Sequence, residues 1–280
     1  MSALPDMAPA RPLLRYHGGK WRLAPWLIQH FPAHKTYTEV YGGGASVLLR
    51  KPRSYAEIYN DLDGEIVNLF RVLRNPAQAR ELVRLVTLTP YAREEFDLAW
   101  LTDGDTVEQA RRTLLRSHAG HSSSGATGQW RTGFRGNVTR SATVPAHDWQ
   151  GLPAVLEAIV TRLRGVVIEN LPALDCLVKY DDRQALHYID PPYPVETRME
   201  RWAGRAYRHE MTDDDHRALA ETAHRLKGAV IVSGYACPLY DQELYRTWDR
   251  REVASRSDNA RHRIEVIWIK PGVTPQMRLL

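Results

Sequence analysis

A short apolar run that ends in a rigid polar tetrapeptide constrains the fold of this chain more than any other segment. Residues 185–189 read Ala-Leu-His-Tyr-Ile, which predicts a buried strand. Asp190-Pro191-Pro192-Tyr193 follows directly. Because proline fixes φ at about −65° and lacks an N–H group, the backbone after Asp190 is expected to be stiff, with carbonyl groups that point outward without partners. We therefore expect a strand that presents rigid hydrogen-bond acceptors at the edge of a sheet.

Strands alternate with helices on both sides of this segment. We expect strands over residues 36–40, 56–59, 166–168, 186–189, 229–233 and 264–269. Helices are expected over residues 21–31, 45–50, 154–164, 173–180 and 212–227. A further helix is expected from a cap at Asn60-Asp61 to Pro76, with apolar residues at helical spacing, namely Leu62, Ile66, Leu69, Phe70 and Leu73. Such alternation predicts a parallel sheet covered by helices on both faces.

The segment between the second and third of these strands has a different character. Residues 77–117 predict consecutive helices without strands, and residues 120–149 are rich in Gly, Ser, Thr and Arg without periodicity. We expect a discontinuous α/β core, made of residues 1–75 and 151–280. An inserted helical and basic module, residues 76–150, is expected to interrupt it.

This inserted module concentrates positive charge. The whole chain has a net charge of +5, yet no acidic residue occurs from Gln109 to His147. The arginines of that stretch are Arg111, Arg112, Arg116, Arg131, Arg135 and Arg140. They are interleaved with Trp130, Phe134 and Asn137, a mixture that can neutralise phosphates and enter a groove of nucleic acid. A solvated basic helix and loop is the alternative interpretation.

The tetrapeptide also suggests a chemistry. The side chain of Asp190 and the carbonyl of Pro191 can accept the two hydrogens of an exocyclic amino group, while Tyr193 stacks on the flat base that carries it. Gly42-Gly43-Gly44 lies between a predicted strand and helix, at the edge where α/β proteins bind nucleotides and where missing side chains let a ligand approach the backbone. Asp61 ends the next strand, where a carboxylate can bind both ribose hydroxyls of a nucleoside-like cofactor or cap a helix.

These motifs, in this order, resemble those of the Dam-type DNA adenine-N6 methyltransferases, which use S-adenosylmethionine. Besides the tetrapeptide, the resemblance rests on Arg15-Tyr16-His17-Gly18-Gly19-Lys20, Glu39-Val40-Tyr41-Gly42-Gly43-Gly44, Asn60-Asp61-Leu62 and Val232-Ser233-Gly234-Tyr235. It covers nearly the whole chain. It implies a Rossmann-like methyltransferase sheet with an inserted, mainly helical target-recognition module, and methyl transfer to the N6 atom of an adenine flipped out of double-stranded DNA.

The resemblance also assigns roles to individual residues. It implies a catalytic tetrapeptide of Asp190, Pro191, Pro192 and Tyr193. It implies S-adenosylmethionine contacts from Tyr16, Gly19, Lys20, Glu39, Tyr41, Gly42, Gly43, Gly44, Asp61, Asn170 and Asp190. DNA contacts are expected from Arg15, Trp130, Arg131, Arg135 and Arg198. Hydrogen bonds to the tetrapeptide would localise the lone pair of the amino nitrogen, so that positioning replaces a covalent intermediate.

The loop from Pro194 to Arg208 follows the tetrapeptide. This catalytic loop carries Arg198, Arg201, Arg205 and Arg208 together with Trp202 and Tyr207. We expect it to be mobile without DNA and to close over the flipped base.

One position departs from the family pattern. The family often has an aspartate shortly after the strand that precedes the catalytic one, which can contact the adenine of the cofactor. Pro172 stands at that place here. Glu169 and Asn170 are the candidates to replace it.

Composition narrows the remaining classes. Cys176 and Cys237 are far apart and show no zinc-site spacing, so we expect neither a disulfide framework nor a metal site. No apolar run approaches a membrane span, and the N-terminus lacks the apolar core of a signal peptide. We expect a cytoplasmic protein that is a monomer in solution and binds double-stranded DNA.

Other acceptors and one other class stay open at this point. The same chemistry could modify cytosine N4, an RNA adenine or a glutamine amide. Asp190 at the first tetrapeptide position favours adenine, and the basic module favours nucleic acid over protein. A catalytically silent DNA-binding protein on this scaffold is a further alternative, but its expected sign, a broken tetrapeptide or glycine turn, is missing from the sequence.

Overall fold

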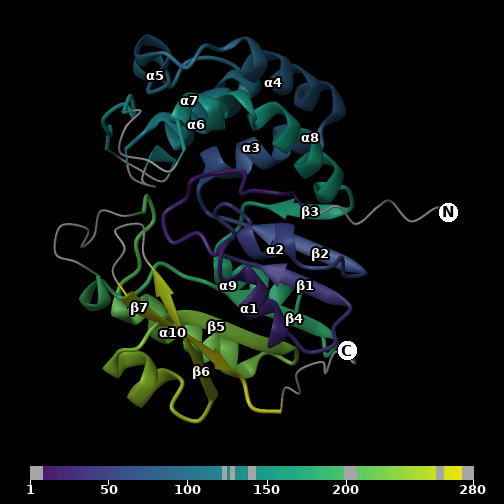
Figure 1. Ribbon diagram of the computed structural model, residues 1–280. Helices are drawn as coiled ribbons and strands as arrows, with labels where there is room; N and C mark the ends of the chain where they lie inside the picture. The colour runs from purple at the N-terminus through teal and green to yellow at the C-terminus, as the bar shows by residue number, and fades with distance from the viewer. Residues whose placement is uncertain are drawn as a thin grey trace.

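The computed structural model describes residues 9–121, 125–126, 130–137, 143–198, 207–256 and 262–272. These residues form a sheet of seven strands in the order β3-β2-β1-β4-β5-β7-β6 (Figure 1). The strands are β1 (Thr36–Glu39), β2 (Ala56–Asn60), β3 (Val166–Glu169), β4 (Ala185–Ile189), β5 (Ala229–Tyr235), β6 (Asp249–Arg256) and β7 (His262–Ile269).

The first five strands are parallel, and their carboxyl ends therefore meet at one edge of the sheet. Thr36 of β1 lies opposite Ala56 of β2 on one side and Ala185 of β4 on the other. Only β7 runs antiparallel to its neighbours β5 and β6 among the described strands. The chain proceeds outward from β1 through β2 to β3 and then returns to β4, so the strand order reverses beside β1. Ligands bind outside the carboxyl ends at such a switch point. The predicted Rossmann-like methyltransferase sheet is confirmed.

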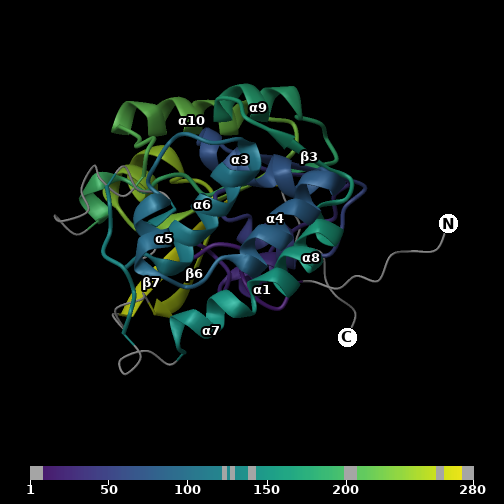
Figure 2. The ribbon, with the colours of Figure 1, turned by 90° about the horizontal axis from the view of Figure 1, so that it is seen from above.

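Helices cover both faces of the sheet. In Figure 2, α9 (Ala173–Lys179) and α10 (Asp213–Arg225) lie on one side of the molecule, and α1 (Ala24–Gln29) and α8 (Leu152–Leu163) on the other. Successive side chains of a strand point to opposite faces of the sheet. Val230 and Val232 pack with α9 and α10, whereas Ile231 packs in the cluster that contains residues of α1, α2 (Ser46–Arg50), α3 (Gly64–Arg74) and α8.

Consecutive helices fill the long connection between β2 and β3, as predicted. After α3 these are α4 (Pro76–Leu88), α5 (Arg93–Leu98), α6 (Thr106–Ala119), α7 (Pro145–Gln150) and α8. They lie together beyond the β3 end of the sheet (Figure 1). Their buried side chains join the sheet: Leu82, Phe96 and Leu114 belong to the same hydrophobic cluster as Tyr59 and Ile168.

The start of α3 differs from the prediction. The cap is Asp63, whose carboxylate accepts a hydrogen bond from the Glu65 N–H at 3.0 Å, so the predicted cap at Asn60-Asp61 is wrong. Leu62 precedes the helix and is 47% exposed, unlike the other apolar positions predicted for it. Pro76 ends α3 as predicted but also begins α4, where a missing N–H is tolerated.

Two further elements differ in the carboxyl half. The polar strand β6 was not predicted, because its only strand partner among the described residues is β7 and no apolar alternation marks it. The predicted capping box is present between Thr212 and Asp215, but α10 ends at Arg225 rather than at Lys227. Short turns of η2 (Val195–Thr197) and η4 (Leu239–Leu244) complete this half. No helix within the described ranges is long and apolar enough to cross a membrane.

Candidate active site

A cavity of about 280 Å³ opens at the carboxyl edge of the sheet, beside the switch point. Ligand pockets typically have volumes of about 300–1,000 Å³, so this cavity is near the lower end of that range. The ends of β1, β2 and β4 form its floor, and the segments 16–20 and 207–211 form its walls. The predicted cofactor residues that line it are Tyr16, Gly19, Lys20, Glu39, Tyr41, Gly42, Gly43, Gly44, Asp61 and Asp190.

The glycine turn is tied to Asp61 from the next strand. The Gly43 N–H donates to Asp61 Oδ2 at 2.7 Å, and the Asp63 N–H donates to Asp61 Oδ1 at 2.8 Å. Burial raises the pKa of Asp61 to about 6, although both backbone hydrogen bonds oppose this shift. Each oxygen thus accepts one backbone N–H, and a carboxylate has about four acceptor positions, so Asp61 keeps acceptor capacity toward the cavity.

The glycines serve packing as well as the cavity. A Cβ atom on Gly42 would lie 2.2 Å from the ring of Tyr59, and one on Gly43, whose φ is +45°, would lie 2.5 Å from the ring of Tyr16. The space that their missing side chains leave is therefore filled by aromatic rings of the protein. The backbone of all three glycines nevertheless lines the cavity.

Glu39 lies at the end of β1 and is buried. Its Oε2 atom accepts hydrogen bonds from the Tyr37 hydroxyl and from the Leu48 N–H, both at 2.8 Å. Burial raises the pKa of Glu39 to about 8, against the effect of these two donors. Glu39 is therefore largely protonated near neutral pH unless a cation approaches it.

Asp190 follows β4 and meets Lys20 from the amino-terminal segment. Lys20 Nζ lies 3.0 Å from Asp190 Oδ2 and donates to the Gly18 carbonyl at 2.7 Å. Ser233 Oγ donates to Asp190 Oδ1 at 3.4 Å. Burial raises the pKa of Asp190, and Lys20 opposes that rise. For Lys20 the balance is the reverse: burial lowers its pKa, but the charges of Asp190, Glu265 and Tyr207 and the hydrogen bond to Asp190 together outweigh burial, and the pKa is raised. The pair is thus an ammonium and a carboxylate at the cavity wall.

Tyr193 packs beside this pair and is only 8% exposed. Lys20 Nζ lies 4.8 Å from the centre of its ring, and the ring of Tyr235 meets it at 4.7 Å and 77°. Its hydroxyl donates to Glu265 Oε2 at 2.9 Å. Glu265 was not predicted as a site residue, although a carboxylate inside the apolar strand Ile264–Ile269 is the kind of signal that could have revealed it.

The carboxyl end of the catalytic loop and the three residues after it form one wall of the cavity. Arg208 contacts the start of α3, with Nη1 at 3.4 Å from Asp63 Oδ1 and Nη2 at 3.1 Å from Glu65 Oε1. Tyr207 donates to the His17 carbonyl at 3.4 Å. These contacts hold Tyr207 and Arg208 against the amino-terminal segment at His17 and against the start of α3. They were not predicted, because they join parts of the chain more than a hundred residues apart.

Arg198 does not have the predicted position for a DNA contact. Its side chain is 7% exposed and pairs with Glu210 at 2.6 Å. It also donates to the Tyr193 carbonyl and lies over the ring of Tyr207. The guanidinium therefore joins the two ends of the catalytic loop instead of facing DNA. The middle of that loop, with Arg201, Trp202 and Arg205, lies outside the described residues.

The place of the missing family aspartate is apolar. Pro172 lines the cavity, and its lining neighbours are Leu171, Ala173 and Leu174. Asn170 is not among the lining residues and instead donates to the Asp61 carbonyl at 2.8 Å, which supports the turn from behind. Glu169 is occupied by Lys179 at 2.7 Å and by Tyr180. Neither candidate therefore replaces the aspartate in the cavity.

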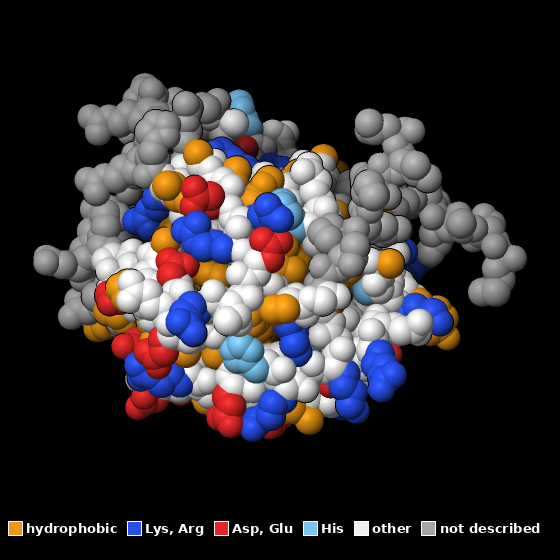
Figure 3. All heavy atoms as spheres, turned by 90° about the horizontal axis from the view of Figure 1, so that it is seen from below, with side chains coloured by type: hydrophobic (Ala, Val, Ile, Leu, Met, Phe, Trp, Pro, Cys, Tyr) orange, Lys and Arg blue, Asp and Glu red, His pale blue; other side chains and the backbone are white. Residues whose placement is uncertain are grey.

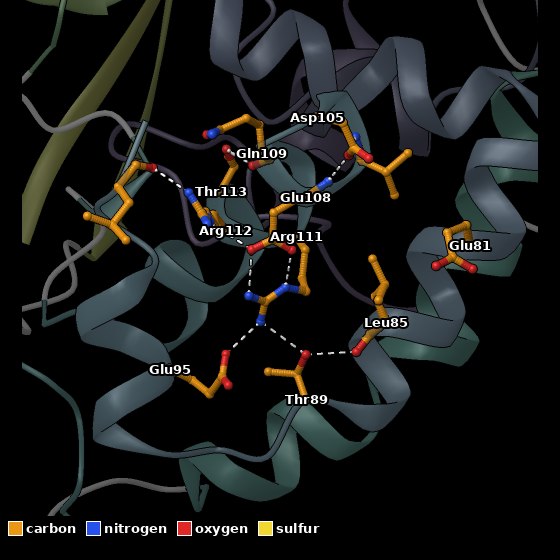
Figure 4. Close-up of polar contacts among 12 residues, drawn as sticks. Glu81, Leu85, Thr89, Glu95, Asp105, Glu108, Gln109, Arg111, Arg112 and Thr113 are labelled. Carbon is orange, nitrogen blue, oxygen red and sulfur yellow. Dashed lines mark hydrogen bonds and ion pairs between the residues drawn. The ribbon is translucent and has the colours of Figure 1, made fainter. Parts of the chain in front are cut away.

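Three of the six arginines between Gln109 and His147 are buried. Arg111 bridges Glu108, at 2.7 Å, and Glu95, at 2.9 Å, and so joins α6 to α5 (Figure 4). Arg112 pairs with Glu108 and Asp103. Arg116 pairs with Glu65 of α3. The expectation that these three arginines neutralise phosphates is wrong, because their own side chains are buried and are paired with acidic residues from outside the stretch.

The other predicted DNA-contact residues lie nearer the surface. Trp130 is 59% exposed, and the side chain of Arg131 is 57% exposed while it pairs with Asp97. Arg135 donates to the His118 carbonyl at 3.1 Å, and the Arg15 backbone exchanges hydrogen bonds with Ser117. Arg140 lies outside the described residues.

The face seen from below in Figure 3 has a different charge pattern, since basic and acidic side chains are interspersed on it. The strand β6 lies at the bottom of Figure 1, and two of its arginines are paired: Arg250 with Asp241 and Glu252, and Arg251 with Asp249. Such a surface lacks the single-sign field that attracts nucleic acid. No group of side chains that could hold a metal ion occurs among the described residues.

Comparison with known proteins identifies a family for this arrangement. A family model described as D12 class N6 adenine-specific DNA methyltransferase matches residues 16–253. No curated protein gives a significant match to the chain. The matched range contains the glycine turn, Asp61, Lys20 and the tetrapeptide, and it ends before Glu265.

Proposed function

Because this chain belongs to the D12 class N6 adenine-specific DNA methyltransferase family, we propose that it transfers a methyl group from S-adenosylmethionine to the N6 atom of an adenine flipped out of double-stranded DNA. Adenine-N6 methylation of DNA is the reaction of the family. The methyl donor, the extruded base and the residues that act on them are the proposal.

The cavity suits S-adenosylmethionine by its donor set. When bound, this cofactor supplies an electrophilic methyl group on a positively charged sulfur. Asp61 would accept hydrogen bonds from ribose hydroxyls with the acceptor capacity that its two backbone bonds leave. Glu39 and Asp190, at the ends of neighbouring strands, would offset cationic charge. Tyr16, Tyr41, Gly19 and the glycine turn complete the wall, and the apolar segment at Pro172 would pack against a flat ring.

Asp190 and the carbonyl of Pro191 act on the acceptor. An adenine amino nitrogen is a poor nucleophile, because its lone pair is delocalised into the ring. Hydrogen bonds from the two amino hydrogens to Asp190 and the Pro191 carbonyl would localise that lone pair and fix its direction. As the nitrogen gains the methyl group it must lose one proton, and the Asp190 carboxylate can accept it.

Lys20 keeps Asp190 able to do this. A buried carboxyl tends to take up a proton, and a protonated Asp190 would lose half of its acceptor function. The ammonium of Lys20 at 3.0 Å stabilises the carboxylate form. Tyr193 would stack on the extruded base, and residues 194–208 would close over it.

The inserted module would hold the DNA. We assign residues 76–150 to target recognition and residues 1–75 and 151–280 to the catalytic core. Trp130, Arg131 and Arg135, with Arg15, would contact the duplex. This assignment is supported by the exposure of Trp130 and Arg131.

The Lys20–Asp190 ion pair at the switch point of the sheet is the observation that carries the proposal. Nucleoside mass spectrometry on DNA from methylation-deficient cells that express wild type or Asp190→Ala tests it. We expect N6-methyladenine with wild type and none with the variant. N4-methylcytosine instead would overturn the choice of base, and unmodified DNA with well-folded wild-type protein would favour an RNA acceptor or a silent scaffold.

A further inference from the structure

A buried carboxylate on the last strand reaches the active site from outside the region that the family model matches. Glu265 lies in β7, opposite Tyr235 of β5, and is 8% exposed. Its Oε2 atom accepts the hydrogen bond from the Tyr193 hydroxyl at 2.9 Å. The family model ends at residue 253, so this contact joins the tetrapeptide to a part of the chain beyond the match.

Glu265 and Asp190 both act on Lys20 and on Tyr193. Both carboxylates raise the pKa of Lys20 against its burial, the effect of Asp190 being the larger. The Lys20 ammonium in turn lies over the Tyr193 ring, at 4.8 Å from its centre. A continuous chain of contacts therefore runs from Glu265 through the Tyr193 hydroxyl and ring to Lys20, and from Lys20 to Asp190.

We propose that Glu265 is a positioning residue of this active site: by binding the Tyr193 hydroxyl it fixes the carboxyl end of the tetrapeptide, and thereby the Pro191 carbonyl and the Asp190 carboxylate. The inference rests on the proposed function. Pro191 and Pro192 make the peptide between Asp190 and Tyr193 stiff, so fixing one end restricts the other. Tyr193 therefore links Glu265 of β7 to the tetrapeptide that follows β4.

The geometry of the tyrosine supports a positioning role. Its ring is confined between Lys20 and the ring of Tyr235, and the hydroxyl is the one point where the side chain makes a charge-assisted hydrogen bond among the contacts described. Charge-assisted hydrogen bonds are short and directional. Loss of this bond would let the tyrosine ring tilt, and misplacement of acceptors by a fraction of an ångström lowers the rate of a reaction that depends on alignment.

Two variants separate the hydrogen bond from the charge. Glu265→Gln removes the charge but keeps an oxygen that accepts from the Tyr193 hydroxyl. Tyr193→Phe keeps the ring and the charge of Glu265 but removes the hydroxyl. Glu265→Ala removes both the acceptor and the charge. Glu252→Gln is the matched control, because it removes an exposed carboxylate from β6, the strand paired with β7.

Single-turnover methylation of a duplex containing the target sequence, as mapped from methylated DNA, is the first readout. We expect Glu265→Ala and Tyr193→Phe each to lower the rate about tenfold to a hundredfold, as for loss of a hydrogen bond to a charged group. The effects in the double variant should multiply to less than the product of the two single effects, because both variants remove the Tyr193–Glu265 hydrogen bond. Glu265→Gln should recover most of the rate, and Glu252→Gln should match wild type.

Base stacking is the second readout, with 2-aminopurine at the target position of the duplex. An extruded 2-aminopurine that stacks poorly fluoresces more strongly, so Glu265→Ala should give a brighter complex than Glu265→Gln. Circular dichroism and the dissociation constant of S-adenosylhomocysteine should stay unchanged in all of these variants. Those two measurements separate positioning from a general loss of structure.

The outcomes distinguish this inference from the proposed function. Full activity of Glu265→Ala and additive effects in the double variant would each overturn the role of Glu265, while leaving the methyltransferase intact. Glu265→Gln as slow as Glu265→Ala would mean that charge rather than the hydrogen bond matters, which also contradicts the proposal. Wild-type protein without any methylation of DNA would refute the proposed function itself.

Discussion

Replacing Lys20 by methionine tests whether an ion pair keeps the catalytic carboxyl ionised. Methionine has a similar length and is apolar, so Asp190 would lose its cation while the wall keeps its shape. The two charged atoms are 3.0 Å apart. At an effective dielectric constant of about 20, two unit charges at that distance attract each other by about 5 kcal/mol, which is an upper bound because Ser233 and water can substitute in part.

The expected size of the effect follows from the pKa of Asp190. Burial raises that pKa and Lys20 lowers it, so removal of Lys20 leaves only the hydrogen bonds from Tyr193 and Ser233 to oppose burial. An adjacent cation typically lowers a carboxyl pKa by about 1 to 3 units. Since the carboxylate is the active form, activity increases with pH through this pKa. We therefore expect the acidic limb of the pH–rate profile to move upward by about 1 to 3 pH units in Lys20→Met.

Single-turnover rates measured across the pH range provide the test. The ratio of wild-type to Lys20→Met rates should be large at low pH and should shrink as the pH rises. Lys20→Arg keeps a cation and should keep the acidic limb near its wild-type position. Lys179→Met, which removes an exposed lysine paired with Glu169 far from the cavity, is the control. A Lys20→Met profile that is lowered by the same factor at every pH would refute this account of Lys20.

Three further predictions concern stability and DNA binding. Glu57→Ala leaves Lys51 and Arg162 buried without the carboxylate that binds them at 2.8 and 2.6 Å, so the free energy of unfolding in urea should fall by about 3–5 kcal/mol. Glu81→Ala, in an exposed pair, should change that free energy little, and equal effects of the two variants would contradict the argument. The pKa of Glu39 is about 8 in the folded state against an ordinary 4.5, so between these values the folded state binds one more proton than the unfolded state, and wild-type stability falls as the pH rises. Glu39→Gln should flatten this pH dependence of stability, and an unchanged slope in the variant would disprove the account. Replacing Arg131 and Arg135 by alanine should weaken DNA binding and reduce its salt slope by about 2, while Arg217→Ala, paired with Glu243, should not; an unchanged slope would place the DNA contact elsewhere.

The sequence predicted the sheet and the catalytic end of β4 because local signals carried them. Parallel strands are buried on both faces and appear as apolar runs, and two consecutive prolines end a strand without any help from distant residues. The glycine turn and Asp61 followed from their places at the ends of predicted strands. Ten of the cofactor residues predicted from these signals line one cavity in the structure.

The failures came from contacts between distant parts of the chain. Arg111 and Arg116 looked like part of a basic surface, because their partners Glu95 and Glu65 lie outside the acid-free stretch. Asn60, Asp61 and Asp63 could each cap α3 by their residue type. The carboxylate of Asp61 instead accepts a hydrogen bond from the distant Gly43 N–H, and Asp63 is the residue that caps the helix. Arg198 looked accessible, since the glutamate that pairs with it belongs to the far end of the same loop.

The shared hydrophobic cluster has a consequence for how such an enzyme could change its target sequence. Helices α4 to α8 have no core of their own in the part of the chain described, since Leu82, Phe96 and Leu114 pack into the cluster that also contains Tyr59 and Ile168 of the sheet. Exchange of residues 76–150 as a cassette would therefore replace part of the catalytic core as well. Exchange should be confined to exposed positions between α6 and α7, such as Trp130 and Arg131, because Ala126 and Phe134 of that segment also pack into the cluster. New specificities in this architecture should arise by loop replacement rather than by recombination of whole domains.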